Sequence, residues 1–316
     1  MINNILNTFK KIWKSKTAQR IISLGSILLT ISVLGWLIYS QWDVLKEALT
    51  DLRPRFLILA FVVYSIILFF TTGIWAQILN SLGHVSPFRT HFFAFCISAL
   101  GKRLPGTLWY IAWRANIYQD ENHSTRLIVL TSGMELLAIV LAAAIISMAL
   151  AIPLIHQFPY SIIGFIIILI ALIILMIPKV NKWIFNKLNV DVSKFSYKEI
   201  AIWTLQYIVV WILNGILLLV IANIFGQVPI SDLNYLIGSI ALTGVLSRVF
   251  LFLPSNFGFG EVSLSLLLSG IMPTSLAAII AISNRIIITS FEIIWALIAL
   301  GFKTLHEKIN PNGLLK

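Results

Sequence analysis

Charged side chains within otherwise apolar stretches are the residues of this sequence best suited to do chemistry. The bases in such positions are Lys102, Arg103, Arg114, Arg248 and Arg285, and the acids are Glu135, Glu261 and Glu292. A charge removed from water is expensive, so a functional role is the first hypothesis for each of them. Guanidinium groups suit phosphate and carboxylate ligands. We therefore predict that the bases bind an anionic group.

The acids are expected to pair with these cations and to gate the site by exchanging ion pairs or a proton. Arg285, Thr289 and Glu292 are spaced at i, i+4 and i+7, which places them on one helix face. We predict that Thr289 belongs to this gating group together with the three glutamates.

Two proline and glycine breaks lie beside these charges. The first contains Pro105 and Gly106 and is followed by Trp109, and the second contains Pro254 and Gly258. Backbone at membrane depth must be hydrogen-bonded, so such a break needs protein or water around it. A helix that starts just after a break points free N–H groups at the cavity, which favours an anion. The alternative is a loop at the interface that merely turns the chain.

Less specific explanations exist for the same charges. Lys102 and Arg103 could be ordinary cytoplasmic positive charges, and Arg114 could reach the interface along its apolar stem. Glu261 could cap a helix, and Arg285 with Glu292 could be a purely structural pair. Glu135 could be a protonated acid within the bundle.

The composition predicts an all-α polytopic membrane protein. Hydrophobic residues make up 59% of the 316 residues and charged residues 11%, with a formal net charge of +11. A soluble domain has about 25% charged residues, so this chain cannot cover a soluble surface. One cysteine and five scattered histidines predict no metal site, and the sequence has no P-loop, dinucleotide fingerprint or nucleophile elbow. We therefore expect no cofactor, no catalytic residues and no nucleic-acid partner.

Six apolar segments are long enough to be full transmembrane helices. They are 21–40, 56–79, 127–151, 160–178, 200–224 and 274–302, and two further apolar stretches, 88–118 and 233–272, are interrupted. The basic N-terminal tail 1–20, the loop 179–199 and the tail 303–316 are predicted to be cytoplasmic. This orientation is consistent only if each interrupted stretch begins and ends on the same side of the membrane. Each would then be a re-entrant hairpin or a pair of tilted spans, and 233–272 is long enough for two spans.

The single membrane domain, 21–302, contains two halves with the same order of features. Each half, about 55–151 and about 198–302, has a span, an interrupted stretch with Leu-Pro, and a span with an acid near its middle. The first spans of the halves run in opposite directions, which predicts an inverted internal repeat. Broken segments at matching places in inverted halves point to a binding site near the midplane.

These motifs resemble the lysylphosphatidylglycerol synthase transmembrane region family, also called the flippase-like domain family. The resemblance covers about 20–305 and rests on the segments 104–109 and 253–261, on Arg114, and on the last-span pattern Arg285-x-x-x-Thr289-x-x-Glu292. It implies that the first motif comprises Pro105, Gly106, Trp109 and Arg114, and the second half Pro254, Gly258, Glu261 and Arg285. Asn256 departs from the pattern, which has glycine there.

The resemblance implies a stand-alone, flippase-like membrane domain without the family's soluble synthase domain. The expected function is movement of a phospholipid or polyprenyl-phosphate-linked lipid between leaflets of a bacterial or archaeal cell membrane. Expected partners are membrane lipids, chiefly anionic ones, and a lipid-synthesis enzyme or glycosyltransferase is a candidate partner. Two other functions stay open: a membrane-embedded lipid-modifying transferase, and a non-catalytic membrane partner of a separate synthase.

Overall fold

The protein is built from α-helices. The computed structural model describes residues 39, 46, 52–82, 85–102, 109–119, 123–150, 197–249 and 258–309. These residues contain eight α-helices that are given bounds, one 3₁₀ helix and no strand. Five helical segments are long and apolar enough to cross a membrane. The prediction of an all-α polytopic membrane protein is thus confirmed in its general form.

Four of the predicted spans correspond to long helices. They are α4 (Arg55–Ser81), α7 (Thr125–Leu150), α11 (Tyr197–Phe225) and α14 (Thr274–Ile309). The predicted spans 21–40 and 160–178, the tail 1–20 and almost all of the loop 179–199 lie outside the described residues. The fifth apolar segment of spanning length, Ile230–Arg248, belongs to the second interrupted stretch.

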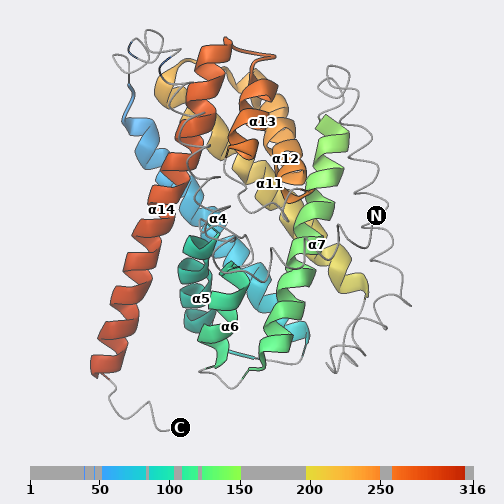
Figure 1. Ribbon diagram of the computed structural model, residues 1–316, viewed down its shortest axis with the longest axis vertical. Coiled ribbons are helices and arrows are strands. Elements are labelled where there is room, and N and C mark those ends of the chain that lie inside the picture. Colours follow the sequence, from blue (N-terminus) through green and yellow to red (C-terminus); the bar gives the residue numbers. More distant parts are fainter. Residues whose placement is uncertain are drawn as a thin grey trace, which may run out of the picture.

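The helices are arranged around α11, which packs against α4, α7 and α12 (Leu233–Val249). Figure 1 shows α4 descending from upper left while α11 rises from lower right, so the two helices cross in opposite directions. It also shows α7 rising on one side of the molecule and α14 descending on the other. The helices α5 (Phe88–Gly101) and α6 (Trp109–Gln119) lie in the lower part, whereas α12 and α13 (Phe259–Leu268) lie in the upper part.

The first interrupted stretch forms an antiparallel helical hairpin. The start of α5 meets the end of α6, where His91 Nδ1 lies 2.6 Å from the Tyr118 hydroxyl. The end of α5 meets the start of α6, where Gly101 approaches the backbone of Tyr110. At 1.5 Å per residue α5 is about 21 Å long and α6 is shorter, so neither crosses a 30 Å hydrocarbon core alone.

The second interrupted stretch forms a similar hairpin of α12 and α13. The Tyr235 hydroxyl near the start of α12 donates a hydrogen bond to the Leu267 carbonyl near the end of α13, at 2.6 Å. Gly260 at the start of α13 faces Ser247 at the end of α12. Since α13 is only ten residues long, the described residues do not provide two full spans here.

Local sequence determines where several helices begin and end. Pro54, Pro87 and Pro273 directly precede α4, α5 and α14, because a proline at a helix start gives up an N–H that has no intrahelical partner. Gly258 precedes α13 with φ 90°, a conformation that glycine adopts without strain. The helix α14 is described to Ile309, past the predicted end of the last span at 302.

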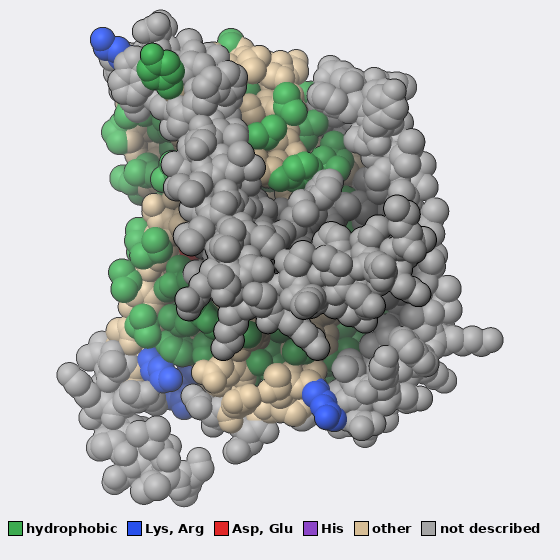
Figure 2. Space-filling view, viewed as in Figure 1, with side chains coloured by type: hydrophobic (Ala, Val, Ile, Leu, Met, Phe, Trp, Pro, Cys, Tyr) green, Lys and Arg blue, Asp and Glu red, His purple; other side chains and the backbone are tan. Residues whose placement is uncertain are grey.

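The described surface has the distribution of side chains expected for a protein in a bilayer. In the view of Figure 2, hydrophobic side chains cover the described middle of the molecule. The Lys and Arg side chains visible in that view lie at its upper and lower ends. This arrangement leaves an apolar zone between two polar ends.

We predict that Gly101→Ala disrupts the packing of the first hairpin. A Cβ at this position would lie 2.9 Å from the Tyr110 nitrogen and 3.0 Å from its Cα, and these backbone atoms cannot move aside easily. Overpacking of this kind typically lowers the free energy of unfolding by about 1–3 kcal/mol. Thermal unfolding of the purified protein in detergent measures the effect.

The matched control is Gly73→Ala in α4, where an added Cβ meets no atom within 4 Å. Alanine is the better helix former by about 1 kcal/mol, so this variant should be as stable as the wild type or more stable. Equal melting temperatures for the two variants would show that α5 and α6 are not packed so closely.

Candidate functional site

The strongest candidate site is a buried ion pair between the first hairpin and α7. Arg114 on α6 donates from Nη1 to Glu135 Oε2 at 2.7 Å. The side chains of Arg114 and Glu135 are only 1% and 5% exposed. The Tyr207 hydroxyl on α11 donates to the other carboxylate oxygen, Oε1, at 3.1 Å. Three helices, α6, α7 and α11, therefore meet at one carboxylate.

Aromatic rings surround the Arg114 guanidinium. Its central carbon lies 4.0 Å from the ring centroid of Trp75, 4.8 Å from that of Phe95 and 5.5 Å from that of Tyr110. The electron-rich ring faces attract a cation where water is excluded. Arg114 Nε also donates to the Ser98 hydroxyl at 3.2 Å. Nη2 is buried and has no hydrogen-bond partner in the described part of the chain.

A buried polar network holds Trp75 in place against the arginine. Trp75 Nε1 donates to the Tyr118 hydroxyl at 2.7 Å, and that hydroxyl lies 2.6 Å from His91 Nδ1. Because the Tyr118 oxygen already accepts from the indole, its own proton is available for His91. The network ties α4, α5 and α6 together beneath the guanidinium.

Two further cations from the predicted set lie near this pair. Lys102 Nζ lies 5.4 Å from the Phe95 ring centroid and 5.6 Å from that of Tyr110, two of the rings that also contact Arg114. Arg248, near the end of α12, lies 5.6 Å from the ring centroid of Trp211 and donates to the Gly244 carbonyl at 2.8 Å.

Contacts between α7 and α11 bring Arg248 toward Glu135. Trp211 Nε1 donates to the Ile139 carbonyl at 3.1 Å, one helical turn beyond the bond from Tyr207 to Glu135. Arg248 contacts the Trp211 ring and interacts electrostatically with Tyr207 and Glu135. Among the described residues, no acid lies within 4 Å of Arg248.

A second ion pair joins the second hairpin to α14. Arg285 Nη1 donates to Glu261 Oε1 at 2.7 Å, and the side chains are 26% and 8% exposed. The Gly258 N–H donates to the other oxygen of Glu261, Oε2, at 3.0 Å, so the acid also caps its own helix. Both explanations that the sequence allowed for Glu261, ion pair and cap, describe this carboxylate.

The other predicted residues take separate positions. The Thr289 hydroxyl donates to the Arg285 carbonyl at 2.7 Å, within its own helix, and Glu292 is buried on α14 two turns after Arg285. Trp109 starts α6 with its side chain half-exposed. Arg103, Pro105, Gly106 and Pro254 lie outside the described residues.

Sequence reasoning did not identify Trp75, Tyr118, His91 and Tyr207 as part of the site. The signal that could have found them is a polar atom on an aromatic side chain inside a span, since such an atom needs a buried partner. The described residues contain no group of three or more His, Cys, Asp and Glu side chains suited to hold a metal ion.

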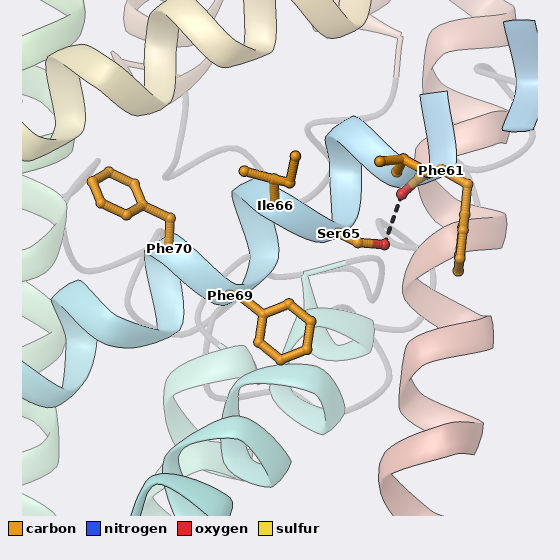
Figure 3. Close-up of a pocket in the computed structure, with 6 residues that line it drawn as sticks. Phe61, Ser65, Ile66, Phe69 and Phe70 are labelled. Atoms are coloured by element: carbon orange, nitrogen blue, oxygen red, sulfur yellow. Dashed lines mark hydrogen bonds between the residues drawn. The ribbon is translucent and has the colours of Figure 1, made fainter. Parts of the chain in front are cut away.

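A groove of about 620 Å³ runs along one face of α4 and is almost entirely apolar. It is lined by Phe61, Val62, Ser65, Ile66, Phe69 and Phe70 (Figure 3). Its single hydroxyl, Ser65 Oγ, donates to the Phe61 carbonyl at 2.7 Å and accepts from Trp295 Nε1 at 3.0 Å. Since no charged residue is among the lining residues, the groove suits a hydrocarbon chain and not a head group.

We predict that Glu135→Ala strongly destabilises the protein. Removing one partner of a buried pair leaves an uncompensated charge, which typically lowers the free energy of unfolding by about 3–5 kcal/mol. The double variant Arg114→Met/Glu135→Leu removes both charges of the pair and should regain most of the loss. Thermal unfolding in detergent measures both. If the double variant were no more stable than Glu135→Ala, the pair would not be the source of the effect.

Comparison with known proteins assigns no family to the chain. No protein-family model matches the sequence, and comparison with curated proteins gives no match. The resemblance to the flippase-like domain family therefore stays a prediction from the motifs.

Proposed function

We propose that this protein is a flippase-like lipid translocase, which moves a lipid with a phosphate-bearing head group between leaflets. The substrate is a phospholipid or a polyprenyl-phosphate-linked lipid. The observation that carries the proposal is the Arg114 guanidinium, which is buried among apolar helices and has one nitrogen without an acceptor in the described residues. A buried donor of this kind is satisfied by an anionic ligand that accepts its hydrogen bond.

The charge of the site supports an anionic ligand. Among the described residues, the bases Arg114 and Arg248 lie near one carboxylate, that of Glu135, so positive charge exceeds negative there. An excess charge at membrane depth is costly unless a counter-charge joins it. A phosphate group supplies both the charge and the acceptor oxygens that Arg114 and Arg248 can use.

The helix directions support the proposed inverted repeat. The first half runs through α4, the α5–α6 hairpin and α7, and the second through α11, the α12–α13 hairpin and α14. Equivalent long helices point in opposite directions, and the hairpins lie toward opposite ends of the molecule (Figure 1). Within this proposal the chain has six full spans and two re-entrant hairpins, with both termini in the cytoplasm of a bacterial or archaeal cell.

The groove on α4 supports a lipid as the source of the anion. It shares its helix with Trp75, the ring closest to the Arg114 guanidinium. Phe70, at one end of the groove, is five residues from Trp75, or about 7.5 Å along the helix axis. An acyl chain can therefore occupy the apolar groove while its head group approaches the charged site.

We predict that Arg248→Gln slows translocation of an anionic lipid. Among the described residues, Arg248 has no ion pair within 4 Å and its hydrogen bond is to a carbonyl of its own helix, so the variant should fold. Loss of one charged ligand should slow flipping about tenfold or more, the factor that corresponds to about 1.4 kcal/mol. The measurement follows fluorescent phosphatidylglycerol in vesicles containing the purified protein, with a quencher that cannot cross the membrane.

The matched control is Arg126→Gln, which removes an exposed arginine at the start of α7 and should flip lipid at the wild-type rate. Wild-type protein that accelerates no lipid would contradict the proposed function. Flipping by Arg248→Gln at the wild-type rate would remove Arg248 from the site.

A further inference from the structure

The two hairpins are fastened to the rest of the molecule by ion pairs with reversed charges. In each case the second helix of the hairpin is joined to the long helix that follows it, by a contact of 2.7 Å. In the first half the hairpin carries the arginine, Arg114, and α7 carries the acid. In the second half the hairpin carries the acid, Glu261, and α14 carries the arginine.

Each carboxylate divides its oxygens in the same way. Glu135 gives Oε2 to Arg114 and Oε1 to the Tyr207 hydroxyl. Glu261 gives Oε1 to Arg285 and Oε2 to the Gly258 N–H. In each glutamate one oxygen thus has a second partner, and the other oxygen holds the arginine. Either arginine can turn to another anion without leaving its glutamate entirely unsatisfied.

The two pairs differ in access and are approached from opposite ends of the molecule. The Arg114 side chain is 1% exposed, whereas that of Arg285 is 26% exposed. Glu135 lies ten residues, or about 15 Å, from the start of α7, and Arg285 lies eleven residues from the start of α14. Because α7 and α14 begin at opposite ends, the pairs lie at comparable depths from the two sides (Figure 1).

We infer that Arg114 and Arg285 are two successive binding stations for the anionic group of one lipid. At each station the anion takes the place of the glutamate on the arginine, and the glutamate reclaims the arginine when the lipid moves on. Breaking the contact removes one attachment between the hairpin and its long helix, which also pack against each other elsewhere, so occupancy of a station weakens the hold on its hairpin. This inference rests on the proposed translocase function and assigns the glutamates the role of competing with the lipid.

The test uses variants that remove the competing charge but keep a hydrogen-bonding side chain. In Glu135→Gln and Glu261→Gln the arginine loses its anionic partner, so a lipid anion should bind more tightly and leave more slowly. We expect affinity for dihexanoyl-phosphatidylglycerol to rise about tenfold, the factor given by about 1.4 kcal/mol of lost competition. Flipping should slow in the same variants. Titration of the purified protein in detergent gives the affinity, and the vesicle assay gives the flipping rate.

Controls separate this role from a purely structural one. Asp232→Asn removes a partly exposed acid outside both pairs and should change neither affinity nor flipping. Dihexanoyl-phosphatidylcholine, whose head group has no net charge, should gain less affinity than the anionic lipid. Inorganic phosphate, tested alongside, shows whether the anion alone is sufficient or a lipid is required.

The results that overturn the inference are distinct from failure of the proposed function. If both glutamine variants bind the anionic lipid as the wild type does and only their melting temperatures fall, the ion pairs are structural fastenings. If tighter binding occurs but the wild-type protein flips no lipid, exchange at the arginines is retained and translocation is rejected. If one lipid passes Arg114 and then Arg285, the slower of the two steps limits the rate. The double variant Arg114→Gln/Arg285→Gln should then flip lipid no more slowly than the slower single variant. Additive losses would contradict one shared path.

Discussion

The arrangement of the first hairpin depends on the need to satisfy the Arg114 guanidinium inside an apolar bundle. A cation at this depth needs an anionic partner, hydrogen-bond acceptors and polarisable surroundings. Glu135 supplies the charge, Ser98 an acceptor, and Trp75 and Phe95 the ring faces. Together with Arg114 on α6 these residues come from four helices, so a single side chain fixes how α4, α5, α6 and α7 meet. The arginine whose Nη2 has no acceptor among the described residues is thus also the residue on which this packing depends.

Short helices make this arrangement possible. A helix that crosses the bilayer presents its middle to other helices and its ends to water, whereas a hairpin of short helices can place helix ends deep in the bundle. Arg248 near the end of α12 reaches the neighbourhood of Glu135 in this way. Interior positions of long helices supply the remaining groups, Glu135 and Tyr207. Charged residues near hairpin tips therefore face fixed groups on rigid helices.

The sequence predicted the elements better than the contacts between them. Apolar length and the two breaks located four long helices and both helical hairpins, because hydropathy and proline act locally. Arg114, Glu135, Glu261 and Arg285 were recognised as unusual from their apolar surroundings. The sequence did not determine which acid pairs with which arginine. Arg285 could pair with Glu292 on its own helix face or with Glu261, and the structure pairs it with Glu261. Trp75 and Tyr207 were missed since an aromatic residue in a span is more often core or interface.

The reversed charges of the two ion pairs are compatible with the proposed inverted repeat. A hairpin and a long helix attract each other equally well whichever of them carries the arginine, because Coulomb attraction does not depend on which partner is positive. The position of the cation nevertheless differs between the two cases. A cation on the hairpin, as with Arg114, is carried along when the hairpin moves, whereas a cation on α14, as with Arg285, stays with the long helix. Within the proposed function, a lipid anion bound to Arg114 would therefore move with the first hairpin. An anion bound to Arg285 would stay with α14.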